Sequence, residues 1–189
     1  TDFGRVSDAM MESATDNSVY TWENNSIYYI TNGIWSPLKR VDDGWGFWDG
    51  VRSANLFLEN FDPKVLERFQ YNEDYDEMID KASKFSLEVR FLRAFYLFEL
   101  AKRYGDIPLI TRTYTQEEIN SVRKTSFADV IDFIAKECTE ITREGGLPED
   151  GVRGETGRVT KGAALALKSR ALLYAASDLH NPAHDLTKW

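Results

Sequence analysis

Four tryptophans lie close together in the first part of the chain. Trp22, Trp35, Trp45 and Trp48 fall within 27 residues, and aromatic residues make up 13% of the sequence. Core packing can use many of these rings. Flat aromatic faces also pack against the C–H faces of sugars, and they lose little conformational entropy when they bind. The clustering therefore suggests a binding surface for an uncharged, partly apolar ligand such as a sugar.

Not all of these tryptophans are expected to bind. Trp35 stands two residues before Pro37, an arrangement that packs turns well. Trp45 and Trp48 flank the start of an expected helix and are expected to lie in the core. We therefore expect the binding ring to come from elsewhere in the cluster.

Residues that could catalyse a reaction or hold a metal are sparse. His180 and His184 are separated by Pro182, so they do not share a helix face, and no third His or Cys joins them. Asp42–Asp43 and Asp49 lack the ligand spacing of a recognised calcium loop. The chain has no G-x-S-x-G motif, and nothing in the sequence brings two carboxylates together. We expect no enzyme activity, no metal and no cofactor.

The charge of the chain also excludes some partners. Its formal net charge is −8, whereas nucleic acids and anionic lipids require a surface rich in Lys and Arg. The single cysteine, Cys138, rules out an internal disulfide framework and is expected to be an inert thiol in a helix. No run of 18 apolar residues and no signal peptide are visible.

The pattern of apolar residues predicts a mainly α protein in one domain, residues 1–189. Residues 1–46 are irregular loops rich in aromatic residues, and the alternation in 26–31 fits one short hairpin. Apolar spacings of three and four residues, with Pro and Gly at the ends, then predict helices. These helices are expected over 47–60, 63–70, 75–104, 126–143 and 160–177.

The long helix 75–104 has two apolar stripes, which predict neighbours on two sides. One stripe comprises Val89, Leu92, Tyr96 and Leu100, and the other comprises Phe91, Phe95 and Phe98. Glu99 and Arg103 are expected to form a solvated i,i+4 pair. Small residues in 160–177 allow close helix contact, as in tetratricopeptide repeats. The expected architecture is therefore a tetratricopeptide-like array.

Two segments carry a more specific signal. Residues 88–94 and 104–109 read E-x-R-F-L-R-A and Y-G-x-x-P-L, while residues 157–167 and 170–174 read G-R-x-x-K-x-A-A-x-A-L and R-x-x-L-Y. These motifs resemble those of the SusD/RagB family, whose members are surface lipoproteins that capture nutrients, usually glycans. Asn55–Asn60 is also similar to the first helix of that family.

The resemblance implies more than a fold. It implies non-catalytic glycan capture at the outer membrane, on a surface-exposed lipoprotein, with delivery to a TonB-dependent SusC-like transporter. Family members are longer, so this chain is expected to be the N-terminal, tetratricopeptide-like part. The C-terminal half of the family fold and the lipid-bearing cysteine are absent from this sequence.

The resemblance also assigns ligand-binding residues. The starch-binding member has T-D…W-x-W-x-x-N, followed by S-W-S-P and preceded by F-x-R. Carried over by position, Trp22 would stack on a sugar ring, and Asn25 and Arg5 would hydrogen-bond to hydroxyls. Tyr20 replaces the first Trp, which keeps an aromatic face but leaves the type of glycan open.

A second interpretation is a helical-repeat scaffold that binds a protein and has no sugar site. It predicts that Trp22 is buried and that Arg5, Tyr20 and Asn25 point apart. Glycan capture instead predicts an exposed face on the Trp22 ring, with the polar side chains within reach of one ligand.

Overall fold

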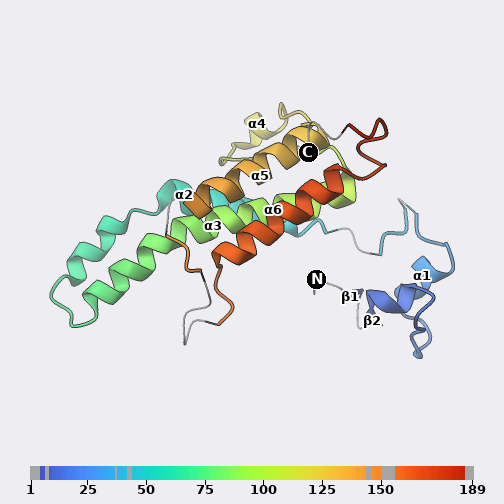
Figure 1. The fold of residues 1–189 in the computed structure, drawn as a ribbon, viewed down its shortest axis with the longest axis horizontal. Coiled ribbons are helices and arrows are strands. Elements are labelled where there is room, and N and C mark those ends of the chain that lie inside the picture. Colours follow the sequence, from blue (N-terminus) through green and yellow to red (C-terminus); the bar gives the residue numbers. More distant parts are fainter. Residues whose placement is uncertain are drawn as a thin grey trace. The chain divides into compact units, whose positions relative to one another are not determined.

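The computed structural model describes most of the chain in two compact units, Thr1–Trp45 and Gly46–Trp189. The described residues are 5–6, 9–36, 38–41, 44–143, 146–149 and 156–185. Their secondary structure is almost entirely helical, so the predicted mainly α class is confirmed (Figure 1). That residues 1–189 form one domain stays a prediction.

The first unit has a small core of its own. β1 (Arg5–Val6) pairs antiparallel with β2 (Ala9–Met10), and η1 (Met11–Ala14) and α1 (Ile27–Thr31) follow. Ala9 and Ile27 are fully buried, and the residues packed around them are Ala14, Tyr20, Tyr28, Ile30 and Val41. The expected hairpin was placed wrongly, because residues 27–31 are helical and the hairpin lies nearer the N-terminus.

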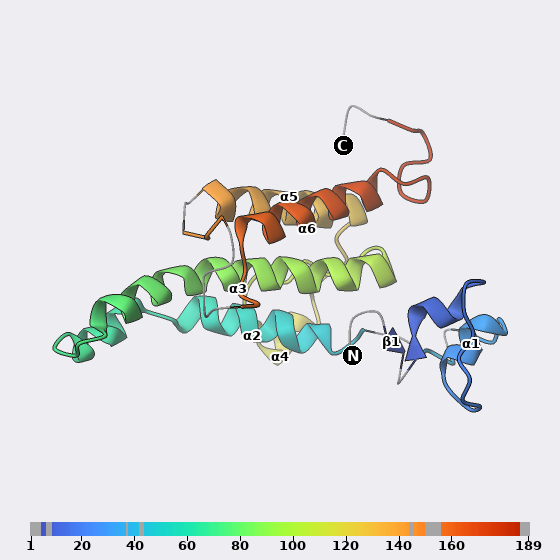
Figure 2. The same cartoon turned by 60° about the horizontal axis from the view of Figure 1, so that its bottom comes forward.

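The second unit is a layered helical array, shown from the side in Figure 2. Its elements are α2 (Phe47–Asn60), η2 (Pro63–Phe69), α3 (Tyr75–Tyr104), α4 (Gln116–Ile119), α5 (Phe127–Arg143) and α6 (Lys161–Ala175). The long helix α3 packs against α2 on one side and α5 on the other, while α6 pairs with α5. The two predicted neighbours of the long helix are thus α2 and α5.

Local signals set the ends of these helices, close to the predicted bounds. The Asp62 side chain accepts a hydrogen bond from Lys64 N at 3.0 Å, and Pro63 begins η2 after α2 ends. Gly105 ends α3 with φ 68°, a left-handed conformation that favours glycine. Thr160 Oγ1 caps α6 by accepting from Ala163 N at 3.2 Å.

The short helix α4 was not predicted, although the sequence carries a signal for it. Thr115 Oγ1 accepts from Glu118 N at 3.2 Å, and Glu118 Oε2 accepts from Thr115 N at 2.9 Å. This reciprocal pair is a capping box, which needs only Thr and Glu three residues apart.

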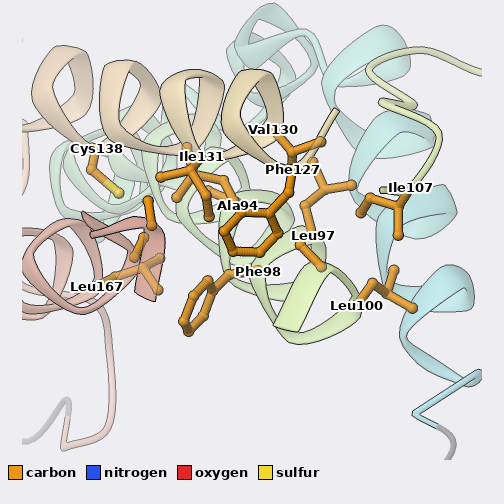
Figure 3. Packing of buried hydrophobic residues seen from close by; sticks show 14 of the residues in the cluster. Ala94, Leu97, Phe98, Leu100, Ile107, Phe127, Val130, Ile131, Cys138 and Leu167 are labelled. Carbon is orange, nitrogen blue, oxygen red and sulfur yellow. The ribbon is translucent and has the colours of Figure 1, made fainter. Parts of the chain in front are cut away.

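The main core lies between α3, α5 and α6, as Figure 3 shows. Its fully buried large side chains include Leu97, Phe98, Leu100, Ile131 and Ile134. α5 also contributes Phe127, Val130 and Ile141 to the buried residues. On α3 the predicted stripes were partly wrong, because Ala94 and Leu97 are buried whereas Leu92 is 37% exposed.

Glu99 also departs from expectation. It pairs with Arg103, with Nη1 2.6 Å from Oε2, and with Lys102, with Nζ 2.8 Å from the same oxygen. The Glu99 side chain is only 1% exposed, so this is a buried group held by two cations and not a solvated pair. Arg103 in addition lies over the ring of Phe47 on α2.

A buried polar network connects three helices and one loop. Arg93 on α3 donates to Asn55 Oδ1 on α2, to the Thr111 carbonyl and to Glu137 Oε2 on α5, each at 3.0 Å. Arg90 reaches Glu137 Oε1 at 3.0 Å. Burial opposes ionisation of Glu137, but the two arginines outweigh it and lower the pKa of this carboxyl below its usual value. Arg90 and Arg93 thus share the Glu137 carboxylate as internal ion pairs.

Asn55 on α2 has a structural role. Its side chain is 1% exposed, and its Nδ2 donates to the carbonyls of Ile110 and Arg112 at 3.2 and 3.1 Å. The loop after α3 is therefore held to α2 through a side chain.

The first prediction concerns Glu137. Replacing it, as in Glu137→Gln, leaves two arginines without their shared counter-charge, and we expect a loss of about 3 kcal/mol of unfolding free energy at pH 7. Because the folded-state pKa of Glu137 is lowered, its stabilisation is present above its ordinary pKa and is lost as the pH falls below about 4. The difference in unfolding free energy between the wild type and Glu137→Gln should therefore become smaller at acidic pH.

The control for this variant is Glu140→Gln. Glu140 pairs with the same Arg90 at 2.7 Å but is 41% exposed, so its loss should cost at most about 1 kcal/mol. Denaturant titrations at several pH values measure both variants. Equal costs for Glu137→Gln and Glu140→Gln would contradict the proposed importance of the buried group.

The second prediction concerns the contact between α2 and α3. A Cβ atom at Gly50 would lie 2.6 Å from the Tyr96 ring, which also packs against Phe47 and Phe95. Gly50→Ala should cost about 1–3 kcal/mol, because the ring must move. Gly46→Ala has nothing within 4 Å of the new atom and should change stability by less than about 0.5 kcal/mol. Chemical denaturation measures the unfolding free energy of both variants. If Gly50→Ala lost less stability than Gly46→Ala, the Tyr96 ring would be able to move aside at little cost.

Candidate functional site

The predicted ligand residues Tyr20 and Trp22 lie together in the first unit. Their ring centroids are 6.3 Å apart and their planes are inclined by 62°. Trp22 is 70% exposed, whereas Tyr20 is half-buried against the small core. The Tyr28 hydroxyl donates to the Tyr20 carbonyl, which ties this loop to α1. One ring is therefore anchored and the other is presented to solvent.

Asn25 lies in the turn between Trp22 and α1. Its Oδ1 accepts from Ile27 N at 3.0 Å, and its carbonyl accepts from Tyr28 N at 3.2 Å. Asn24 precedes it with φ 64°, a left-handed conformation that Asn tolerates better than most residues. Asn25 thus helps to shape the start of α1, and its role as a ligand contact stays a prediction.

Arg5 is described only through its backbone. It lies in β1, opposite Met10 of β2. Its side chain lies outside the described part of the chain, so its predicted contact with a ligand also stays a prediction. The structure thus brings Tyr20 and Trp22 together and places Asn25 three residues further along.

The other tryptophans of the cluster divide between surface and core. Trp48 is half-buried against the core of the second unit, as expected. Trp45 was also expected in the core, but it is 60% exposed. Phe47 and Val51 take the buried positions at the start of α2, while Trp45 precedes that helix. Residue spacing alone does not show which of these side chains is buried.

Trp35 is held in place but remains accessible. Its backbone N–H donates to the Tyr29 carbonyl at 2.9 Å, and the residue is 56% exposed. A bridge between Ser36 and Lys39 follows, and Lys39 Nζ lies 3.9 Å from the centre of the Tyr29 ring. Trp35 and Trp45 are thus two further exposed rings, although the sequence predicted a packing role for each.

The groups considered for metal binding have other contacts. The His180 ring stacks on Phe127 with centroids 3.6 Å apart, and His184 Nδ1 lies 3.6 Å from Asp178 Oδ1. Within the residues that the structure describes, no group of three His, Cys, Asp or Glu side chains could hold an ion. The same residues contain no helix long and apolar enough to cross a membrane.

Cys138 is an unreactive core residue, as predicted. Its side chain is fully buried in the core of the second unit. Burial, with the charge of Glu137 beside it, raises the pKa of the thiol to about 12. A thiolate is therefore not available at neutral pH.

Comparison with known sequences identifies the family. The profile of a SusD-like family, described as "Starch-binding associating with outer membrane", matches residues 5–173. The chain therefore belongs to the SusD-like family, as its helix motifs suggested. A search of curated proteins found none that matches.

Solved structures show the same relationship. A SusD-like protein from Bacteroides fragilis is 33% identical with a TM-score of 0.56, over 71% of this chain and 24% of that protein. A SusD-like carbohydrate-binding protein from the same species is 29% identical with a TM-score of 0.66, over 94% and 33%. A laminarin-binding SusD-like protein is 24% identical with a TM-score of 0.69, over 92% and 36%. This chain thus spans about a quarter to a third of the length of these proteins.

The third prediction concerns the stability of Trp22→Ala. Because the ring is mostly exposed, the variant should lose less than about 0.5 kcal/mol. Trp48→Ala removes a ring that packs on the core and should lose about 1–3 kcal/mol. Thermal denaturation of both variants would test this. A large loss in Trp22→Ala would mean that the ring is held by contacts rather than presented for binding.

Proposed function

We propose that this chain captures a glycan without chemistry at the bacterial cell surface. The observation that carries the proposal is the Trp22 ring, 70% exposed and set beside Tyr20 on a loop anchored to α1. Trp22 stacks on a sugar ring, and Tyr20 supplies a second, inclined aromatic surface. Arg5 and Asn25 donate hydrogen bonds to the hydroxyl groups of the sugar. Rigid rings with polar neighbours are a common arrangement for sugar recognition.

Family membership supports this proposal. The description of the family names starch binding and the outer membrane, and a 29% identical relative is described as carbohydrate-binding. We propose that the whole protein is a surface-exposed lipoprotein of the outer membrane and hands its glycan to a TonB-dependent SusC-like transporter. Capture and transfer of this kind need no catalytic residues and no cofactor.

The alternative is a helical-repeat scaffold that binds a protein. That interpretation predicted a buried Trp22, and the exposed ring favours glycan capture over it. Tyr20 adds a second ring beside Trp22, with the two ring centroids 6.3 Å apart. The layered helices of the second unit are compatible with either function.

The fourth prediction tests glycan capture directly. Calorimetry with a panel of polysaccharides, starch among them, should identify at least one that the full-length protein binds. Trp22→Ala should weaken that binding about tenfold, because stacking on a ring contributes up to about 1.5 kcal/mol beyond the area that it buries. Tyr20→Ala should weaken it less, because the Tyr20 ring is half-buried.

Trp45→Ala is the matched control. Trp45 is exposed to a similar degree, at 60%, but is not among the proposed ligand residues. Its substitution should leave the affinity unchanged. Equal losses in Trp22→Ala and Trp45→Ala would place the site elsewhere, and binding of no polysaccharide would favour the scaffold.

A further inference from the structure

The segment that carries the proposed site has a one-sided charge. Between Arg5 and Lys39 the sequence contains no Lys, Arg or His, but it contains the carboxylates Asp8, Glu12, Asp16 and Glu23. With Arg5 included, this segment has one positive and four negative side chains, so residues 5–38 carry a net charge of −3. The exposed aromatic surface is therefore set in an acidic segment.

Three of these carboxylates lie in the described part of the first unit. Glu23 is exposed and follows Trp22 directly, so their Cα atoms are about 3.8 Å apart. Asp16 is also exposed, four residues before Tyr20. Glu12 Oε1 accepts from Asn17 Nδ2 at 2.7 Å, which satisfies the carboxylate without neutralising it. Within this segment of the described chain, none of the three carboxylates has a basic side chain in its own sequence neighbourhood.

The first basic residue after this segment, Lys39, lies against an aromatic ring. Lys39 Nζ lies over the Tyr29 ring, 3.9 Å from its centre, and Arg40 follows Lys39 at the far end of the segment. The charge of Glu23 therefore acts on a ligand at Trp22 over a separation on the order of the Debye length, which is about 8 Å at physiological ionic strength. An anionic group on the ligand is repelled there, whereas an uncharged hydroxyl group is not.

We infer that this surface selects uncharged glycans and discriminates against those that carry uronate, sulfate or other anionic groups. The inference rests on the proposed function and adds to it the chemical class of the ligand. Glu23 is the main determinant of specificity, because it is exposed and adjacent to the stacking ring. Asp16 adds to the same repulsion from further along the loop. The affinity for neutral glycans is not reduced at this surface, because an uncharged ligand is not repelled by the carboxylates.

The test compares matched polymers on the full-length protein. Soluble starch, laminarin and xyloglucan are each measured by calorimetry beside their carboxymethylated forms, which share the backbone and differ in charge. At least one neutral polymer should bind, and its carboxymethylated form should bind at least about fivefold more weakly at low salt. Raising the salt from about 20 mM to about 300 mM should narrow this gap, because screening weakens the repulsion.

Variants assign the effect to particular residues. Glu23→Gln should improve the affinity for the carboxymethylated polymer about two- to threefold, as expected for one unit charge at this range in water, and should leave the neutral polymer unchanged. Glu67→Gln removes the same charge from an exposed residue of the second unit and should change neither affinity. Asp16→Asn should act in the same direction as Glu23→Gln, with a smaller effect.

The possible outcomes separate the two proposals. If neutral and carboxymethylated polymers bind equally, or if salt weakens the binding of the anionic form, the charge inference is wrong while glycan capture stands. The same holds if Glu23→Gln and Glu67→Gln behave alike. If no polymer of either kind binds, glycan capture fails and the charge inference fails with it.

Discussion

The buried ion pairs of Glu137 are the interaction on which the second unit depends. Arg93 contacts α2 through Asn55, α5 through Glu137 and the following loop through the Thr111 carbonyl. Apolar packing is not directional, whereas the two terminal nitrogens of the buried Arg93 guanidinium need acceptors in fixed positions, which these three partners supply. The motif E-x-R-F-L-R-A therefore contributes both to the core and to the geometry of the array. Its glutamate, Glu88, pairs with Arg158 of the second motif.

The first unit depends on a much smaller set of contacts. Ala9 and Ile27 form its buried centre, and the Tyr28 hydroxyl fixes the loop that carries Tyr20 and Trp22. Few apolar side chains are available here, so hydrogen bonds and turns hold the loop in place. The small core leaves Trp22 exposed, in a segment whose neighbouring residues along the chain are mostly polar or acidic. Such a surface suits stacking on a sugar better than it suits a large apolar interface.

Much of the fold could be predicted from the sequence because the signals are local. Pro63, Gly105 and Thr160 set helix ends through groups only a few residues away, and the bounds of α2 and α3 agree with the prediction. The periodicity of α5 also predicted its buried face. The choice of Tyr20 and Trp22 as a candidate pair came from similarity to a known family. The sequence alone could not show how exposed either ring is.

Other features were decided only by tertiary packing. Glu99 has the spacing of a solvated pair with Arg103, yet it is buried because α3 has neighbours on both sides. Residues 26–31 alternate as a strand does, but in the fold Ile27 is buried in the small core as the first residue of a helix, and its N–H donates to Asn25 Oδ1. Trp45 is exposed because Phe47 and Val51 take the buried positions at the start of α2. The sequence by itself thus determined the family, the long helices and the charge of the segment that carries Trp22, since these depend on residue type and short-range spacing. Tertiary structure decided which side chains are buried and which are presented, because burial depends on what lies opposite each face.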